Sequence, residues 1–226
     1  VSGPYASQSG SFQVRTLAAE LDYPWALAFL PEGGYLVTER TGRLRVLDKT
    51  GRPESDPVAG LPGIAVTGQG GLLDIALHPD FAANRTLYLS YVAQGARGYG
   101  TEVLRATLAG SPGNRRLDEV DVIFRARPKS GGGRHFGSRL AFGPDGTLFI
   151  SLGDRGTRPR AQALDDHAGS IIRLTADGNI PADNPFVGRT GARPEIYSYG
   201  HRNVQGLTLR TADGQLWAHE HGPQGG

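Results

Sequence analysis

Apolar stretches of strand length, paired around acidic turns, recur four times along the chain. They occupy residues 26–39, 74–91, 139–154 and 206–222. In each segment an apolar run leads into a turn that contains aspartate or glutamate, usually with proline, and a second apolar run follows. Proline presets one turn dihedral angle, and aspartate and glycine accommodate the others. Apolar runs bounded by turns are typical of strands, so the pattern predicts four β-hairpins.

Repeated hairpins at this spacing predict an all-β fold, a β-propeller of four-stranded blades, in a single domain over residues 1–226. The following turn residues are interpreted as fold-building rather than chemical: Pro31, His78, Pro79, Asp80, Pro144 and Asp145. The best helical candidate, residues 161–172, contains Gly169, so we predict a loop that enters a strand. Four hairpins do not close a ring of long blades, and we expect the propeller to be incomplete at the C-terminus.

Composition narrows the class of protein. With 226 residues, 38% of them hydrophobic and 20% charged, the chain can bury a sizeable core. No apolar run approaches the roughly 20 residues that a membrane-spanning helix needs. The net charge is +2 and the arginines are scattered, so we expect no nucleic-acid partner. Cysteine is absent, which excludes disulfides, thiolate metal sites and a cysteine nucleophile.

The N-terminal sequence indicates processing. Methionine is absent from the chain, so Val1 is not the first residue of the translated product. Residues 1–12 are small and polar and contain no apolar signal core. We interpret Val1 as a mature N-terminus left after export, in preference to an artificial boundary, and we expect a periplasmic or extracellular protein.

Loops next to inner strands are the places where a propeller binds ligands, so polar residues there are the candidates for chemistry. The candidates are Gln69, His135, Asp154, Arg202, Asn203, Gly222 and Pro223. His135 is unusual because it follows three glycines and an arginine and directly precedes an apolar strand. Local sequence leaves simpler interpretations open: a solvated loop histidine, a turn-capping aspartate, a polar loop glutamine and an arginine in a surface ion pair.

Six motifs, in order, resemble the glucose/sorbosone dehydrogenase family: "GQGGLLDIALHPDF", "HFGSRLAFGPDG", "SLGDRG", "IPADNPF", "EIYSYGHRNVQGL" and "HEHGP". The resemblance covers Leu21 to Gly226 and implies a six-bladed propeller, pyrroloquinoline quinone (PQQ) held with calcium, and export. The "HFGSRL" form is more similar to the aldose sugar dehydrogenase branch, because Arg134 stands where the classical soluble glucose dehydrogenases have an acidic residue.

The same resemblance implies roles in oxidising an aldose at its anomeric carbon to the lactone, with hydride transfer to the quinone. His135 matches the catalytic base, which also contacts the cofactor, and the pKa of histidine suits this task. Asp154 matches its carboxylate partner, and Gln69 matches the residue that binds the sugar hydroxyl. Arg202 and Asn203 match the cofactor-binding pair, and the charge of Arg202 would also stabilise the reduced cofactor during catalysis.

The calcium ion implied by the resemblance matches the backbone carbonyls of Gly222 and Pro223, since calcium prefers oxygen ligands. His219 and His221 share one strand face, but without a third ligand zinc is only a minor alternative. Two departures from the family stand out. Val204 replaces a proline, and the chain ends before the lysine and arginine residues that complete the family's PQQ clamp.

The expected partners are an aldose sugar and an external electron acceptor, for a protein that has no membrane span and is a monomer in preference to an oligomer. Two other classes of function stay open. A calcium-dependent propeller hydrolase of the lactonase type would use Asp154 and Asn203 as metal ligands. A non-catalytic propeller would only bind its ligand, since fold alone does not determine function.

Overall fold

The computed structural model describes residues 2–222 and 224, and this part of the chain is almost entirely β. Its helices are a single turn, α1 (Phe81–Asn84), and a 3-10 segment, η1 (Arg158–Gln162). No helix in the described range has the length and apolar character to cross a membrane. The strands are β1 (Ser2–Ser7), β2 (Gly10–Val14), β3 (Pro24–Phe29), β4 (Tyr35–Glu39), β5 (Arg43–Leu47), β6 (Leu72–Leu77), β7 (Thr86–Gly95), β8 (Gly98–Ala109), β9 (Arg116–Arg125), β10 (Leu140–Phe142), β11 (Leu148–Ser151), β12 (Ser170–Leu174), β13 (Ile196–Tyr199), β14 (Val204–Leu209) and β15 (Leu216–Glu220).

Each predicted hairpin forms the first two strands of one antiparallel sheet, so the hairpin prediction is confirmed. The sheets have the strand orders β3-β4-β5, β6-β7-β8-β9, β10-β11-β12-β13 and β14-β15. Two of them have the predicted four strands within the described residues, while the first has three and the last has two. Residues 161–172 include the end of η1 and a loop that enters β12, close to the prediction.

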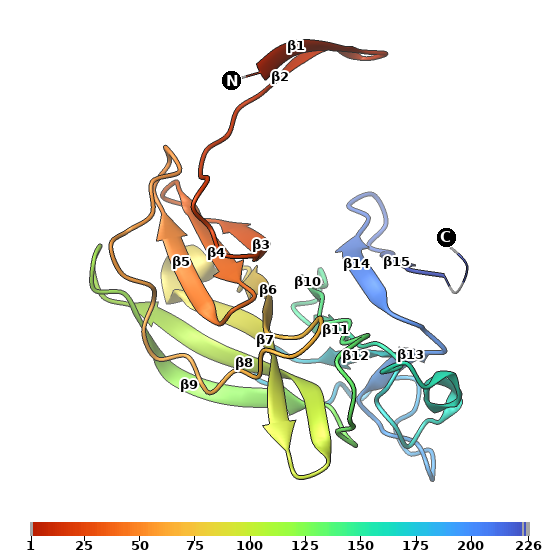
Figure 1. Ribbon diagram of the computed structural model, residues 1–226. Helices are drawn as coiled ribbons and strands as arrows, with labels where there is room; N and C mark the ends of the chain where they lie inside the picture. The colour runs from red at the N-terminus through yellow and green to blue at the C-terminus, as the bar shows by residue number, and fades with distance from the viewer. Residues whose placement is uncertain (1, 223, 225–226) are drawn as a thin grey trace.

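The four sheets follow one another around an arc (Figure 1). Strand β3 contacts β6, β6 contacts β10, and β10 contacts β14, so the first strand of each sheet is the innermost. Sheets that radiate from a shared axis are the arrangement of a propeller, and the predicted fold class is confirmed. The loops that precede these innermost strands therefore lie at the same end of the axis that the sheets share.

Buried hydroxyl groups in β4, β7 and β11 join each sheet to the next. Each side-chain oxygen accepts a backbone N–H from its own inner strand or the residue before it, and donates to a backbone carbonyl in or just before the next inner strand. These blade-joining hydroxyls and their acceptors are Thr38 with Leu73, Ser90 with Ser138, and Ser151 with Val204. Satisfied hydrogen bonds of this kind contribute about 1 kcal/mol each, and a buried group that loses its partner costs more.

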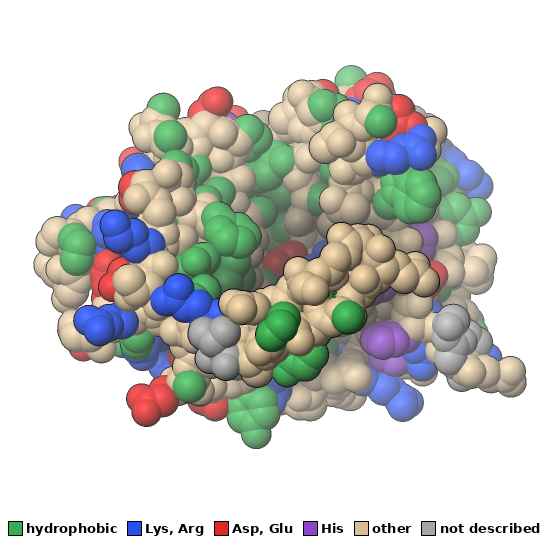
Figure 2. Space-filling view, turned by 90° about the horizontal axis from the view of Figure 1, so that it is seen from above, with side chains coloured by type: hydrophobic (Ala, Val, Ile, Leu, Met, Phe, Trp, Pro, Cys, Tyr) green, Lys and Arg blue, Asp and Glu red, His purple; other side chains and the backbone are tan. Residues whose placement is uncertain are grey.

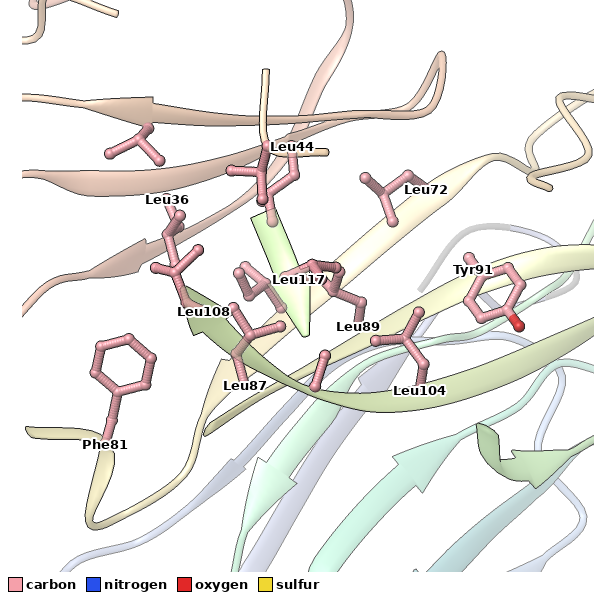
Figure 3. Close-up of a cluster of buried hydrophobic side chains, with 14 of the residues drawn as sticks. Leu36, Leu44, Leu72, Phe81, Leu87, Leu89, Tyr91, Leu104, Leu108 and Leu117 are labelled. Atoms are coloured by element: carbon pink, nitrogen blue, oxygen red, sulfur yellow. The ribbon is translucent and has the colours of Figure 1, made fainter. Parts of the chain in front are cut away.

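The largest apolar cluster fills the space between the first two sheets (Figure 3). Leu36 and Leu44 of the first sheet pack with Leu87 and Leu104 of the second, and none of the four has exposed surface. Burying a leucine side chain contributes about 1.5–3 kcal/mol, so this interface is a main source of stability. A second cluster around Tyr88 joins the second sheet to the third.

The ends of the arc are more exposed than its middle. The β1-β2 hairpin extends away from the other sheets, and its side chains are exposed (Figure 1). Phe29 in β3 and Trp217 in β15 are more than half exposed. Seen from above, the molecule is hollowed near its middle, with apolar side chains gathered on one side of the hollow (Figure 2).

Candidate active site

The loop that enters β10 carries His135 and is held against the loop that precedes β6. The Gln69 N–H donates to the Gly133 carbonyl at 2.7 Å, and Gln69 Oε1 accepts the backbone N–H of His135 at 2.8 Å. A Cβ atom on Gly68 would collide with the Gly133 carbonyl, so the approach of the two loops requires glycine there. The structure thus brings two predicted site residues, from neighbouring blades, into direct contact.

His135 and Asp154 form a buried pair. Nδ1 of His135 lies 2.6 Å from Oδ1 of Asp154, and the two residues are 8% and 2% exposed. The same carboxylate oxygen accepts the Gly156 N–H at 2.7 Å, and the Asp154 N–H donates to the Arg202 carbonyl at 2.8 Å. Because an ionised carboxylate only accepts hydrogen bonds, Nδ1 of the neutral imidazole carries the proton and Nε2 keeps its lone pair.

Gln69 and Asn203 have their amide groups oriented by backbone N–H groups. A backbone N–H can only donate, so the Gln69 atom that faces His135 is the oxygen. Asn203 Oδ1 likewise accepts the Gly137 N–H at 3.1 Å, and it also accepts Gln205 Nε2 at 3.2 Å. The NH2 groups of Gln69 and Asn203 are therefore the parts of these side chains left to donate to a ligand.

A cavity of about 280 Å³ adjoins these groups. It is lined by Trp25, Arg40, Gln69, Leu73, Phe136, Gly137, Asn203, Gln205 and His221. Of the predicted residues, Gln69 and Asn203 line the cavity directly. His135 adjoins it through its bond to Gln69 and through the next two residues of the chain, and Asp154 lies behind His135. The volume is just below the range of about 300–1,000 Å³ that is typical of ligand sites.

Arg202 lies beside the cavity rather than in its lining. Its backbone N–H donates to the Glu220 carboxylate, and its Nη1 donates to the His221 carbonyl at 3.0 Å. The guanidinium therefore holds the chain that leads to the predicted calcium ligands. Gly222, the next residue, is half-buried, whereas Pro223 lies outside the described residues.

The lining residues outside the predicted site include Trp25, Arg40 and Gln205, together with His221, which was considered only in the zinc alternative. Arg40 stands directly after β4, as Asp154 stands shortly after β11, so the same positional rule applied to the first hairpin would have found it. Trp25 is an aromatic residue within β3, and the rule does not cover it. Arg40 Nη1 donates to the carbonyls of Gly68 and Gly70 at 2.8 and 3.2 Å, which places a cation beside Gln69.

The two histidines of the zinc alternative have different surroundings. The His219 ring lies against Gly206, where a Cβ atom would collide with it, whereas His221 lines the cavity. Across residues 2–222 and 224, no three histidine, aspartate or glutamate side chains gather as a metal site would require.

Comparison with known proteins identifies the family. The sequence matches the Glucose / Sorbosone dehydrogenase family model over residues 21–226. The chain belongs to the glucose/sorbosone dehydrogenase family. It is 47% identical to aldose sugar dehydrogenase YliI of Escherichia coli, over 94% of this chain and 57% of that protein. It is 31% identical to quinoprotein glucose dehydrogenase B of Acinetobacter calcoaceticus, over 96% of this chain and 50% of that protein. The chain thus spans about half the length of these relatives.

Solved structures of the family share the fold. The apo-form of the soluble aldose sugar dehydrogenase from Escherichia coli matches with a TM-score of 0.89 and 45% identity, over 94% of this chain and 61% of that chain. The PQQ-bound form of aldose sugar dehydrogenase from Streptomyces coelicolor matches with a TM-score of 0.79 and 37% identity, over 92% and 59%. The family resemblance of the sequence motifs is confirmed, as is the greater similarity to the aldose sugar dehydrogenase branch.

Proposed function

We propose that the full protein oxidises aldose sugars at the anomeric carbon to lactones, with PQQ as the electron acceptor in the site and His135 as the base. The observation that carries this proposal is the buried His135–Asp154 pair, which leaves Nε2 of His135 free, while Gln69 accepts a hydrogen bond from the backbone N–H of the same histidine. Relatives named aldose sugar dehydrogenase and quinoprotein glucose dehydrogenase support the same chemistry.

The donors at the cavity suit a flat, anionic group such as PQQ. Arg40 supplies a guanidinium, and the free NH2 group of Asn203 supplies a neutral donor. Trp25 and Phe136 offer apolar ring surface. A planar group with carboxylates and quinone oxygens needs donors at its edge and apolar contact on its faces, and this set provides both. Arg202 adds a second cation next to Asn203 in the chain.

When bound, PQQ supplies the two-electron acceptor, and the protein supplies position, charge and a base. His135 Nε2 takes the proton of the anomeric hydroxyl while the hydrogen on that carbon leaves with its electron pair, so the C–O bond becomes the lactone C=O. Asp154 stabilises the imidazolium that results. The Gln69 NH2 group donates to a sugar oxygen and orients the hydroxyl toward His135. An external acceptor finally removes the electrons.

The hydrolase alternative fits these contacts less well. Asp154 Oδ1 already accepts hydrogen bonds from His135 and Gly156, and Asn203 Oδ1 accepts two more. A metal ion on either Oδ1 atom would compete with hydrogen bonds that position the loops. A propeller that only binds a ligand would have no use for a buried base with a free lone pair.

Calcium belongs to the proposal, with the carbonyls of Gly222 and Pro223 as its ligands. Gly222 directly follows His221, which lines the cavity. The His221 carbonyl accepts a hydrogen bond from Arg202, so Gly222 adjoins the proposed cofactor site. Oxygen ligands of this kind suit the ion. We also propose that the protein acts outside the cytoplasm and as a monomer.

Reconstitution tests the proposal. The full protein, supplied with PQQ and Ca²⁺, should bleach an artificial dye acceptor when glucose or another aldose is added. Bleaching should require PQQ, should stop when EDTA removes the calcium, and should be lost in His135→Gln. Sugar oxidation that proceeds without PQQ, or lactone hydrolysis by the PQQ-free protein, would contradict the proposal.

A further inference from the structure

The sequence of the loop that carries His135 predicts a flexible loop. It contains Gly131, Gly132 and Gly133 in succession, and glycine loses more conformational freedom on ordering than any other residue. A Cβ atom on Gly131 or Gly132 would meet no atom within 4 Å, so side-chain packing does not hold these two positions. A base on such a loop needs anchors that act on the backbone.

Arg155 supplies two such anchors. Its Nη1 donates to the Arg134 carbonyl, and its Nη2 donates to the Gly132 carbonyl at 2.7 Å. Its guanidinium carbon lies 3.5 Å from the centre of the Phe136 ring, within the range of a cation–π contact. One guanidinium thus holds the residues immediately before and after His135.

We propose that Arg155 is a positioning residue for His135, which fixes the backbone of the glycine-rich loop so that the imidazole meets its carboxylate partner and the substrate together. The inference rests on the proposed function and deepens it. It also explains why two successive residues of the turn after β11 contact the loop of His135. Asp154 holds the ring of His135, and the next residue, Arg155, holds the backbone on both sides of it.

The conformation of Arg155 indicates that its placement matters. Its φ of 59° lies in the left-handed region, which is uncommon for residues other than glycine. Its Nε is buried without a hydrogen-bond partner among the described residues. Burial, together with the charge of Arg160, lowers the pKa of Arg155 to about 10, which leaves it protonated at neutral pH. Such unfavourable features persist where the surrounding structure requires them.

A second arginine anchors the earlier part of the same loop. Arg160 donates to the Pro128 carbonyl at 2.9 Å and to Ser130 Oγ at 2.7 Å, and its Nε lies 2.8 Å from Asp166. Arg160 therefore holds the start of the loop, and Arg155 holds the part next to the base. Loss of Arg155 should loosen residues 132–136 and leave residues 128–130 in place.

Arg155→Gln and Arg155→Lys, compared with Arg158→Gln, test this role. Arg158 is exposed and, among the described residues, its side chain makes no hydrogen bond or ion pair, so its loss controls for charge. In the PQQ-free protein, amide hydrogen exchange at residues 132–136 should accelerate about tenfold or more in Arg155→Gln, as expected for local opening. In the reconstituted protein, kcat should fall on the order of tenfold to hundredfold, the cost of a misplacement of about 1 Å.

Two further measurements distinguish a positioning role from a general structural role. The KM for the sugar should change less than kcat, since Arg155 does not line the cavity itself and acts through the placement of His135 and Phe136. Arg155→Lys should be intermediate in both exchange and kcat, because an ammonium lacks the planar fork that reaches two carbonyls.

The outcomes are distinguishable. Exchange in Arg155→Gln that equals exchange in Arg158→Gln overturns the proposal, and so does faster exchange with unchanged kcat. If Arg155→Gln fails to fold, as judged by its melting curve, Arg155→Lys is judged by the same two criteria. If the wild-type protein oxidises no sugar, the proposed function fails, and the exchange measurement alone decides whether Arg155 holds the loop.

Discussion

Two buried histidine–carboxylate pairs in this protein have nearly the same geometry and different chemical prospects. His135 lies 2.6 Å from Asp154, and His167 lies 2.7 Å from Glu195, with both histidines almost fully buried. The difference is in the second ring nitrogen. Nδ1 of His167 accepts the backbone N–H of Arg127 at 2.9 Å, whereas no described residue is hydrogen-bonded to Nε2 of His135.

This difference shows that a close carboxylate does not by itself make a base. Both nitrogens of His167 are in use, so its ring can join two segments of the chain but cannot take a proton without losing the Arg127 bond. Burial also lowers the pKa of His167, although the hydrogen bond to Glu195 opposes the effect. His135 combines an oriented ring with a free lone pair beside a cavity, which is what proton transfer requires.

The largest expected contrast is between His135→Gln and His167→Gln. The first should lower turnover of the reconstituted protein by about a hundredfold or more, the scale of general-base catalysis. The second should leave turnover per folded molecule unchanged. Dye-coupled assays measure both, and PQQ affinity in His135→Gln serves as the control for an intact site. Near-normal turnover in His135→Gln would show that the base has been misidentified.

Substitution of the two carboxylates should also affect turnover unequally, with the larger effect at Asp154, but the difference should be smaller than for the histidines. Asp154→Asn replaces an acceptor by an amide that can donate to Nδ1, which would move the proton of the neutral ring to Nε2. Turnover should fall on the order of tenfold to hundredfold, because the base then lacks both its lone pair and its charge stabilisation. Glu195→Gln should not change it. Equal effects of the two substitutions on kcat would remove the distinction between the pairs.

For stability the order is reversed: loss of the histidine should cost more free energy of unfolding in the His167 pair than in the His135 pair. His167→Ala leaves the Arg127 N–H and the Glu195 carboxylate without their partner, so the free energy of unfolding should fall by about 1–3 kcal/mol or more. His135→Ala should cost less, since its site borders a cavity that water can enter. Urea unfolding of the two variants measures the difference.

The smallest expected effect is on the pH dependence of stability. Below about pH 6.5 the unfolded chain protonates a histidine that the fold keeps neutral at position 167, so stability should fall as the pH falls. Burial alone would raise the pKa of Glu195, but the hydrogen bond with His167, a backbone hydrogen bond and the charge of Arg193 together outweigh it, and the pKa is lowered. Its contribution is present above its unfolded pKa and is lost as the pH falls through its folded value. Urea unfolding at several pH values should show a shallower loss in His167→Gln than in the wild type.

The fold was largely predictable because turn chemistry is local. The four hairpins, the propeller class and the loop before β12 all follow from short stretches of sequence. The outer strands of each sheet carry no repeated motif, so their positions came only from the structure, although four-stranded blades were predicted and two sheets have them. The fold-building assignment of Asp145 also agrees with its contacts, since it accepts hydrogen bonds from Thr147 and Arg173.

The site was predictable in part, and the missed residues have physical reasons. His135, Asp154, Gln69 and Asn203 come together as the motifs suggested. The proposed role of Arg155 could not be seen, because its hydrogen-bond partners are backbone carbonyls, which carry no mark in the sequence. The same holds for His167, whose second nitrogen is occupied by a backbone N–H forty residues earlier in the chain.

The blade-joining hydroxyls have a consequence for how the molecule opens. Each spans one interface, so disturbance should pass between adjacent sheets only, as in a linear array of coupled units. Ser90 bridges the second and third sheets, the same interface at which Gln69 meets His135, and its acceptor is the carbonyl of Ser138, three residues beyond the base. Thermal fluctuations at that one interface would therefore widen the site before either sheet loses its own strands.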